Sequence, residues 1–170
     1  MNKGIVAGAV AGLVGTWVMS EAQRLWTYAV DGDAPESAGG RHDARDWQER
    51  RENQNSNELA AQAIARYILG RSLTEQELRF AAPLSHYLFG AAVGAVYGAY
   101  AERRQAPASG AGFGTTVWLA ADEIAMPLLG LSDSTARRPL EMHLQSLVAH
   151  LVFGVATELT RRSLHGATEV

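Results

Sequence analysis

Four charge-poor stretches constrain the fold of this chain most. Lysine, arginine, aspartate and glutamate are scarce in residues 4–20, 81–101, 105–121 and 142–157. Each stretch is close to the roughly 17–25 residues that a helix needs to cross the hydrocarbon core of a bilayer, or slightly shorter. Shorter spans are tolerated where the bilayer thins or flanking side chains reach the interface. The pattern therefore predicts four membrane-crossing helices.

Two of these stretches share an opening motif. Residues 86–90 read His-Tyr-Leu-Phe-Gly and residues 150–154 read His-Leu-Val-Phe-Gly. Upstream of each, the runs 12–21 and 114–123 both lead from a glycine through an apolar segment to a glutamate. The repetition predicts an all-α fold, a four-helix transmembrane bundle built from two tandem helical hairpins.

The region between the first two predicted spans is polar, and it lowers the hydrophobic content of the whole chain to an ordinary value. Hydrophobic residues make up 47% of the 170-residue chain, which is typical of soluble proteins, but residues 31–80 alone hold ten acids and seven bases. We expect a single membrane domain, 1–170, with spans at about 3–28, 81–103, 110–130 and 140–163, and an extramembrane segment at 31–73. Within that segment, apolar residues at helical spacing predict a short amphipathic helix over 58–69. Thr74 and Glu77 form a capping-box pattern that starts the next helix at Glu75. A soluble helical bundle with a large core remains an alternative.

Glycines recur every four residues on the predicted helices. Small residues on one stripe allow two helix backbones to approach closely, which is how helices associate in lipid. The predicted packing glycines are Gly8, Gly12, Gly90, Gly94, Gly98 and Gly154.

Several ionisable residues fall within or beside the apolar stretches, where such groups are costly and are functional candidates by default. The candidates are Glu21, His86, Asp122, Glu123, His143, His150 and Glu158. Hairpin geometry is expected to place Glu21 beside His86 and Glu123 beside His150. A histidine and a carboxylate at such positions can share a proton near neutral pH. Two other interpretations stay open. The histidines and glutamates can serve structure alone, or Glu21, His86, Glu123 and His150 can bind a metal ion.

Other functional classes lack support in the sequence. There is no cysteine and therefore neither a disulfide nor a thiolate metal site. No phosphate-binding loop or nucleophile-elbow motif is present, and a net charge of −3 does not favour nucleic acid as a partner. We expect a non-enzymatic protein without a cofactor. Its expected partners are the lipid bilayer and either further copies of itself or a larger membrane complex.

The second half of the chain resembles a known family. The residues that carry the resemblance are two segments, 118–123 and 127–131, and a series of later positions. These positions are Pro139, His143, residues 150–152, Gly154, Glu158 and residues 161–162. This arrangement resembles the YagU-like family of bacterial inner-membrane proteins of unknown function, best over residues 83–162. The resemblance implies a polytopic inner-membrane protein with a link to acid tolerance, and it implies no catalytic residues.

Basic residues at the ends of the predicted spans indicate the orientation. Lys3, the pair Arg103 and Arg104, and the pair Arg161 and Arg162 share a side with the termini, against Arg137 and Arg138 on the other side. Cytoplasmic loops are enriched in such residues, so the termini are expected in the cytoplasm. The leading functional expectation is a pH-responsive or proton-handling membrane protein. The alternative is a structural or accessory subunit of a membrane complex.

Overall fold

The computed structural model describes residues 3–31, 58–101, 107–129 and 140–166, and the predicted loop at 31–55 therefore lies outside the described residues except for Asp31. The arginines at 103, 104, 137 and 138 also lie outside them. The described part of the chain contains helices and no strand, which confirms the all-α class.

Each predicted helix is present within a few residues of its expected bounds. The helices are α1 (Lys3–Asp31), a helix over 58–69, α3 (Glu75–Ala101), α4 (Pro107–Trp118), the π-helix η1 (Leu119–Ala125), α5 (Met126–Leu128) and α6 (Leu140–Gly166). The segments α4, η1 and α5 follow one another without a break, so the predicted third helix is a single rod with a π-helical section that the sequence did not predict.

A rigid corner joins the helix 58–69 to α3. Gly70 has a positive φ of 66°, a conformation that glycine adopts without steric cost, and it ends the helix. The backbone N–H of Thr74 donates to Glu77 Oε2 (2.9 Å), and the N–H of Glu77 donates to the Thr74 hydroxyl (3.3 Å). These bonds confirm the capping box. Gln62 braces the corner through both its amide oxygen and its amide nitrogen, which bond the backbone N–H and C=O of Leu73.

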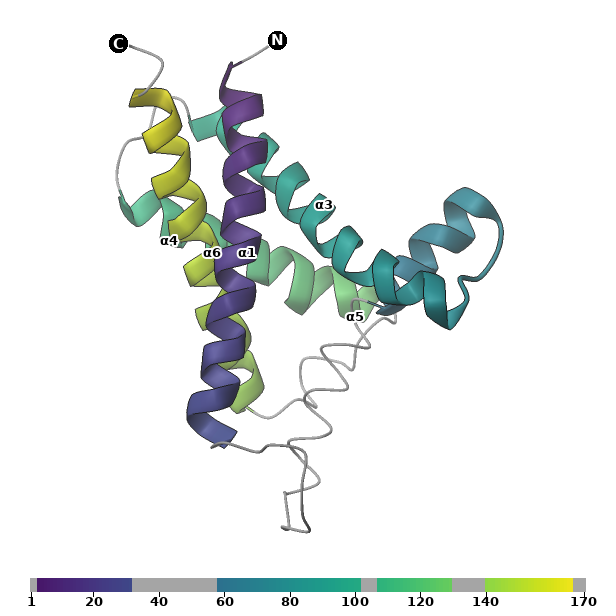
Figure 1. Cartoon of the computed structure of the whole chain (residues 1–170). Coiled ribbons are helices and arrows are strands. Elements are labelled where there is room, and N and C mark those ends of the chain that lie inside the picture. The colour runs from purple at the N-terminus through teal and green to yellow at the C-terminus, as the bar shows by residue number, and fades with distance from the viewer. Residues whose placement is uncertain (1–2, 32–57, 102–106, 130–139, 167–170) are drawn as a thin grey trace.

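The helices pack in the order α3, α1, α6, α4. Helix α1 contacts both α3 and α6, and α6 contacts α4 on its other side. Figure 1 shows α1 and α6 running side by side, with the first turn of α1 and the last turn of α6 at the same end of the molecule. A small apolar core of Met19, Val117, Ala149 and Phe153 lies where these helices meet.

Glycine seams hold each hairpin together. In the first hairpin, Gly8 faces Gly94 and Gly98, and Gly12 faces Gly90. In the second hairpin, Gly110 and Gly114 on α4 face α6. Gly110 lies against Gly154 and Glu158, and Gly114 lies against His150. A Cβ atom at these glycines would collide with the facing helix, mostly with its backbone, so the close approach depends on the missing side chain.

The packing of the second hairpin differs by one helical turn from the register that the repeated sequence motifs predict. The carbonyl group of Gly90 faces Gly12, whereas the carbonyl group of His150 faces the corresponding Gly114. His150 therefore occupies the place of Gly90, four residues away from the alignment that matches the two histidine motifs. By the same register, His86 corresponds to Ser146.

Polar and small residues fill the interior, and large apolar residues cover the outside. The largest fully buried side chains are Glu158, Thr16 and Thr157. The exposed large apolar residues on the long helices include Leu13, Trp17, Leu25, Leu84, Leu88, Val96, Leu128, Leu140, Leu144 and Leu159. Large apolar side chains exposed in such numbers are typical of surfaces that contact lipid or another protein.

Two helices are long and apolar enough to cross a membrane, at Lys3–Trp26 and Glu75–Ala101. The sequence predicted four such helices. The other two predicted spans carry charged residues, since Asp122 and Glu123 lie in η1, and Glu158, Arg161 and Arg162 lie in α6.

Candidate acid and histidine site

A π-helical turn presents two consecutive acids to α6. In η1 the backbone N–H of Met126 bonds the carbonyl of Ala121, five residues back. Pro127, one residue further on, favours a wider turn, because it has no N–H to bond the carbonyl of Glu123 and its ring would clash with that carbonyl in a regular α-helix. Widening the turn avoids the clash. It also allows Asp122 and Glu123 to contact the same neighbouring helix, and π-turns of this kind often occur at functional sites.

Glu123 is hydrogen-bonded to His143. Its Oε1 lies 2.7 Å from His143 Nδ1, and the two side chains are only 7% and 16% exposed. Asp122 accepts a hydrogen bond from the Ser146 hydroxyl, and its Oδ2 lies 3.8 Å from His150 Nδ1. The expected partner of His150 was Glu123, so the structure assigns the acids differently, with Glu123 on His143 and Asp122 toward His150.

The tautomer of His150 follows from its other contact. Nδ1 lies 2.9 Å from the backbone carbonyl oxygen of Ser146. A carbonyl oxygen only accepts hydrogen bonds, so Nδ1 carries the hydrogen and Nε2 is the acceptor of the neutral ring. A proton taken up by His150 is therefore bound at Nε2.

His86 joins the same group from α3. It interacts electrostatically with both His150 and Asp122. Glu21, its predicted partner, bonds Arg24 at 2.9 Å instead, in a largely exposed pair. The structure thus brings together His86, Asp122, Glu123, His143 and His150 from three elements. Ser146 is a member of the site that the sequence did not single out, although its place one turn before His150 was a usable signal.

Glu158 belongs to a separate polar cluster nearer the chain termini. It bonds Arg161 (2.8 Å and 3.1 Å) and Arg162 (2.8 Å), and its side chain is 1% exposed. Tyr97 reaches this cluster from α3, with its ring 6.0 Å from the Arg161 guanidinium and its hydroxyl bonded to Ser109 at 3.2 Å. Among the predicted polar residues, Glu158 is therefore not part of the acid and histidine site.

No group of three or more histidine or acidic side chains within the described ranges is arranged to hold a metal ion. The proposed ligand set of Glu21, His86, Glu123 and His150 is not assembled, because Glu21 pairs with Arg24 and Glu123 with His143.

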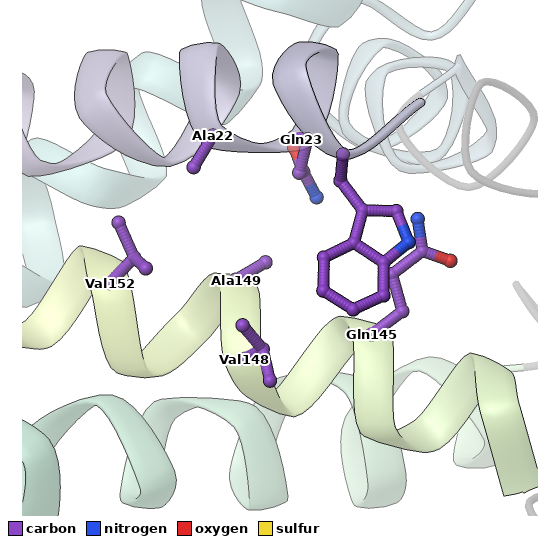
Figure 2. Close-up of a pocket in the computed structure, with 7 residues that line it drawn as sticks. Ala22, Gln23, Gln145, Val148, Ala149 and Val152 are labelled. Carbon is purple, nitrogen blue, oxygen red and sulfur yellow. The ribbon is translucent and has the colours of Figure 1, made fainter. Parts of the chain in front are cut away.

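A shallow apolar groove separates α1 from α6. Figure 2 shows Ala22 and Gln23 of α1 opposite Gln145, Val148, Ala149 and Val152 of α6, and Trp26 completes the lining. No titratable side chain lines this groove. Helix α1 therefore places no charged side chain along this groove.

The chain belongs to a family of proteins of unknown function, DUF1440, whose model matches residues 60–159. The chain matches no curated protein and no solved structure. The match covers α3, η1 and α6 up to residue 159, and so it includes every member of the acid and histidine site. No named relative supports the YagU-like designation.

Proposed function

We propose that the protein is a four-span helical protein of the bacterial inner membrane whose acid and histidine site takes up and releases protons as pH changes. The membrane placement is supported by the two span-length apolar helices and by the apolar exterior around a polar interior. Helices α4–η1–α5 and α6 complete the bundle, and Glu123, Glu158 and Arg161 are nearly buried within it. The termini are assigned to the cytoplasm because Lys3, Arg161 and Arg162 lie at their end of the bundle.

One observation carries the proton-handling proposal, namely the two adjacent acids held against the histidines of α6. A low-dielectric surrounding disfavours separated charges, so Glu123 and His143 can exist as an ion pair or as a neutral pair that differs by the position of one proton. Protonation of Asp122 would remove a negative charge that acts on His86 of α3. Proton binding at the site would therefore change the contact between η1 and α6. It requires no covalent chemistry and no cofactor.

The structural-subunit alternative rests on the premise that glycine stripes bind partner helices. In the fold, Gly8 and Gly12 contact Gly90 and Gly94, and Gly154 contacts Gly110 and Gly114, all within the chain. These stripes are occupied and are not available to a partner.

Membrane placement is tested by alkaline carbonate extraction and by a reporter fused to the C-terminus. We expect the protein to stay in the membrane pellet and the reporter to be cytoplasmic. Recovery in the soluble fraction would refute the bundle as a membrane domain. A reporter active only outside would reverse the orientation.

Proton handling is tested by ¹⁵N NMR of histidine-labelled protein in detergent between pH 5 and 8. We expect the ring signals of the histidines in the site to respond to pH in this range. In Glu123→Gln the His143 ring signals should move, because the side chain bonded to its Nδ1 is changed. Glu21→Gln is the matched control and should leave these signals unchanged. Histidines that remain neutral throughout, or an equal effect of both substitutions, would overturn the proposal.

Vesicle experiments then separate conduction from sensing. Purified protein is reconstituted in liposomes that contain a pH-sensitive dye, and the outside is acidified. Faster internal acidification than in empty liposomes, abolished in Asp122→Asn, would indicate conduction. A response equal to that of empty liposomes would limit the site to sensing.

A further inference from the structure

The helix over 58–69 exposes its large apolar side chains instead of burying them. Its buried residues are the small Ala61 and Ala65. Its exposed large apolar residues are Leu59, Ile64, Tyr67, Ile68 and Leu69, and Tyr67 is 92% exposed. A surface helix of a globular protein normally faces the core with its large apolar residues and water with its polar ones. The arrangement in this helix is the opposite, so the described residues leave its apolar side open to a partner.

Four of the exposed residues belong to one continuous apolar face. Residues 59, 63 and 67 form one row at four-residue spacing, and residues 64 and 68 form a second row. At about 3.6 residues per turn, the two rows together cover about half of the helix circumference, and they contain no charged side chain. Glu58, Gln62 and Arg66 form a separate polar stripe at the same spacing. An apolar face beside a polar stripe is the pattern of helices that lie in the interface of a membrane.

A short corner ties this helix to a helix of membrane-spanning length. Residues 70–74 join it to α3, which is long and apolar enough to cross a membrane. Arg71 and Glu77 form an exposed ion pair at this corner (2.6 Å), and charged groups favour water or headgroups over the hydrocarbon core. Gln62 holds the helix to the corner through its two bonds to Leu73. If α3 crosses the membrane, the helix over 58–69 is therefore held within a few residues of the boundary between lipid and water.

The corner lies at the end of the bundle away from the start of α1. Helices α1 and α3 are antiparallel, because Gly8 faces Gly98 and Gly12 faces Gly90. In Figure 1 the helix over 58–69, in blue, lies beside the first turns of α3 and away from α1 and α6. It therefore occupies the side of the membrane opposite the first turn of α1.

The apolar exterior of α3 continues to this corner. Phe80 and Leu84, within roughly the first three turns of α3, are 74% and 57% exposed. In the membrane placement of the proposed function these side chains contact lipid, and the helix over 58–69 adjoins this part of α3. Tyrosine is enriched at the membrane–water interface because its ring is apolar and its hydroxyl is polar, and Tyr67 is the most exposed of the large apolar residues in the helix. The partner that fits this continuous surface is lipid.

We propose that the helix over 58–69 lies in the membrane–water interface on the side opposite the first turn of α1. Ile64, Tyr67 and Ile68 contact the acyl chains, and Gln62 and Arg66 lie toward the headgroups. The proposal rests on the membrane placement in the proposed function and is independent of proton handling.

Single spin labels test this placement, because the chain has no cysteine of its own. The variants Ile64→Cys, Tyr67→Cys and Ile68→Cys label the apolar face, and Arg66→Cys is the matched control on the polar stripe of the same helix. Each labelled full-length chain is reconstituted in vesicles of phosphatidylethanolamine and phosphatidylglycerol. Power-saturation electron paramagnetic resonance then compares collisions of the label with oxygen, which concentrates in lipid, and with a water-soluble nickel complex.

Two further labels on α3 supply the reference values. Leu84→Cys lies at an exposed position of the apolar span and is the reference for lipid, and Gln76→Cys lies at an exposed position of the first turn and is the reference for water. We expect the ratio of oxygen to nickel collisions at the three apolar positions to approach that of Leu84→Cys. The ratio for Arg66→Cys should resemble that of Gln76→Cys.

Each outcome decides one part of the proposal. Water-like ratios at the three apolar positions, with a lipid-like ratio for Leu84→Cys, would overturn the interfacial helix and leave the membrane placement intact. Low collision rates with both reagents would show that protein covers the face, either another segment of this chain or a second copy, and would overturn lipid as its partner. A water-like ratio for Leu84→Cys would overturn the membrane placement and this inference with it.

Discussion

Two glutamate–arginine pairs with the same spacing make a direct test of burial in this protein. Glu158–Arg161 and Glu21–Arg24 are both three residues apart on a helix, with closest nitrogen–oxygen distances of 2.8 Å and 2.9 Å. The side chains of the first pair are 1% and 4% exposed, whereas those of the second are 40% and 70% exposed. The spacing and the closest distance are therefore matched, while Glu158 is buried and also makes a second bond to Arg161 and one to Arg162.

Glu158→Gln should lower the free energy of unfolding by about 3–5 kcal/mol, the range found when one member of a buried ion pair is removed. The substitution keeps the size of the side chain and one acceptor oxygen, so the missing charge is the variable. Glu21→Gln should cost only about 0–1 kcal/mol, because water screens an exposed pair.

The measurement is reversible unfolding in mixed micelles, followed by circular dichroism, with both variants in the same detergent. High salt should reduce the small Glu21 effect and leave the Glu158 effect nearly intact, since buried pairs are screened less. Equal costs for the two substitutions would refute the argument, because they would mean that the cluster around Glu158 is solvated.

Two further substitutions test the packing and the π-turn. Gly94→Ala should destabilise the protein by about 1–3 kcal/mol, because the new methyl group would lie 2.7 Å from the Cα of Gly12; Gly112→Ala, in open space on α4, should be neutral or stabilising by about 0.5–1 kcal/mol. Equal destabilisation by both alanines would contradict the seam. Pro127→Ala restores the N–H that an α-helical turn needs, so η1 should convert to α-helix and one of the two acids should lose its partner on α6. Histidine ¹⁵N NMR checks this, and spectra identical to those of the original chain would show that the proline does not maintain the turn.

Local sequence determined where the helices begin and end. Gly70, the Thr74 and Glu77 capping box, and the apolar periodicity each act over a few residues, and the helix bounds agree with them. The repeated motifs also indicated two hairpins correctly in outline, because a backbone can approach another closely only where side chains are absent, and that requirement is visible as spaced glycines.

The partners of the ionisable residues were decided by the tertiary structure. The sequence motifs align His86 with His150, but the packing of the hairpins places His150 opposite Gly114 and shifts the second hairpin by one turn. A shift of four residues keeps the same helix face and changes only the depth, so periodicity alone cannot detect it. The pairing of Glu123 with His143 follows from this shift together with the wide turn before Pro127.

Two of the contacts between the hairpins illustrate the same difference between what the sequence and the tertiary structure determine. Gly15 allows α1 to approach Phe153 and Thr157 of α6 closely, whereas α3 and α4 meet through the stacked rings of Tyr97 and Phe113, 4.1 Å apart. The glycines and rings are readable in the sequence, but which helices they join depends on distances across the whole bundle. The sequence by itself therefore determined the helices, their polar residues and their apolar exterior, while only the tertiary structure decided which acid meets which histidine, because that depends on the relative depth of helices distant in the chain.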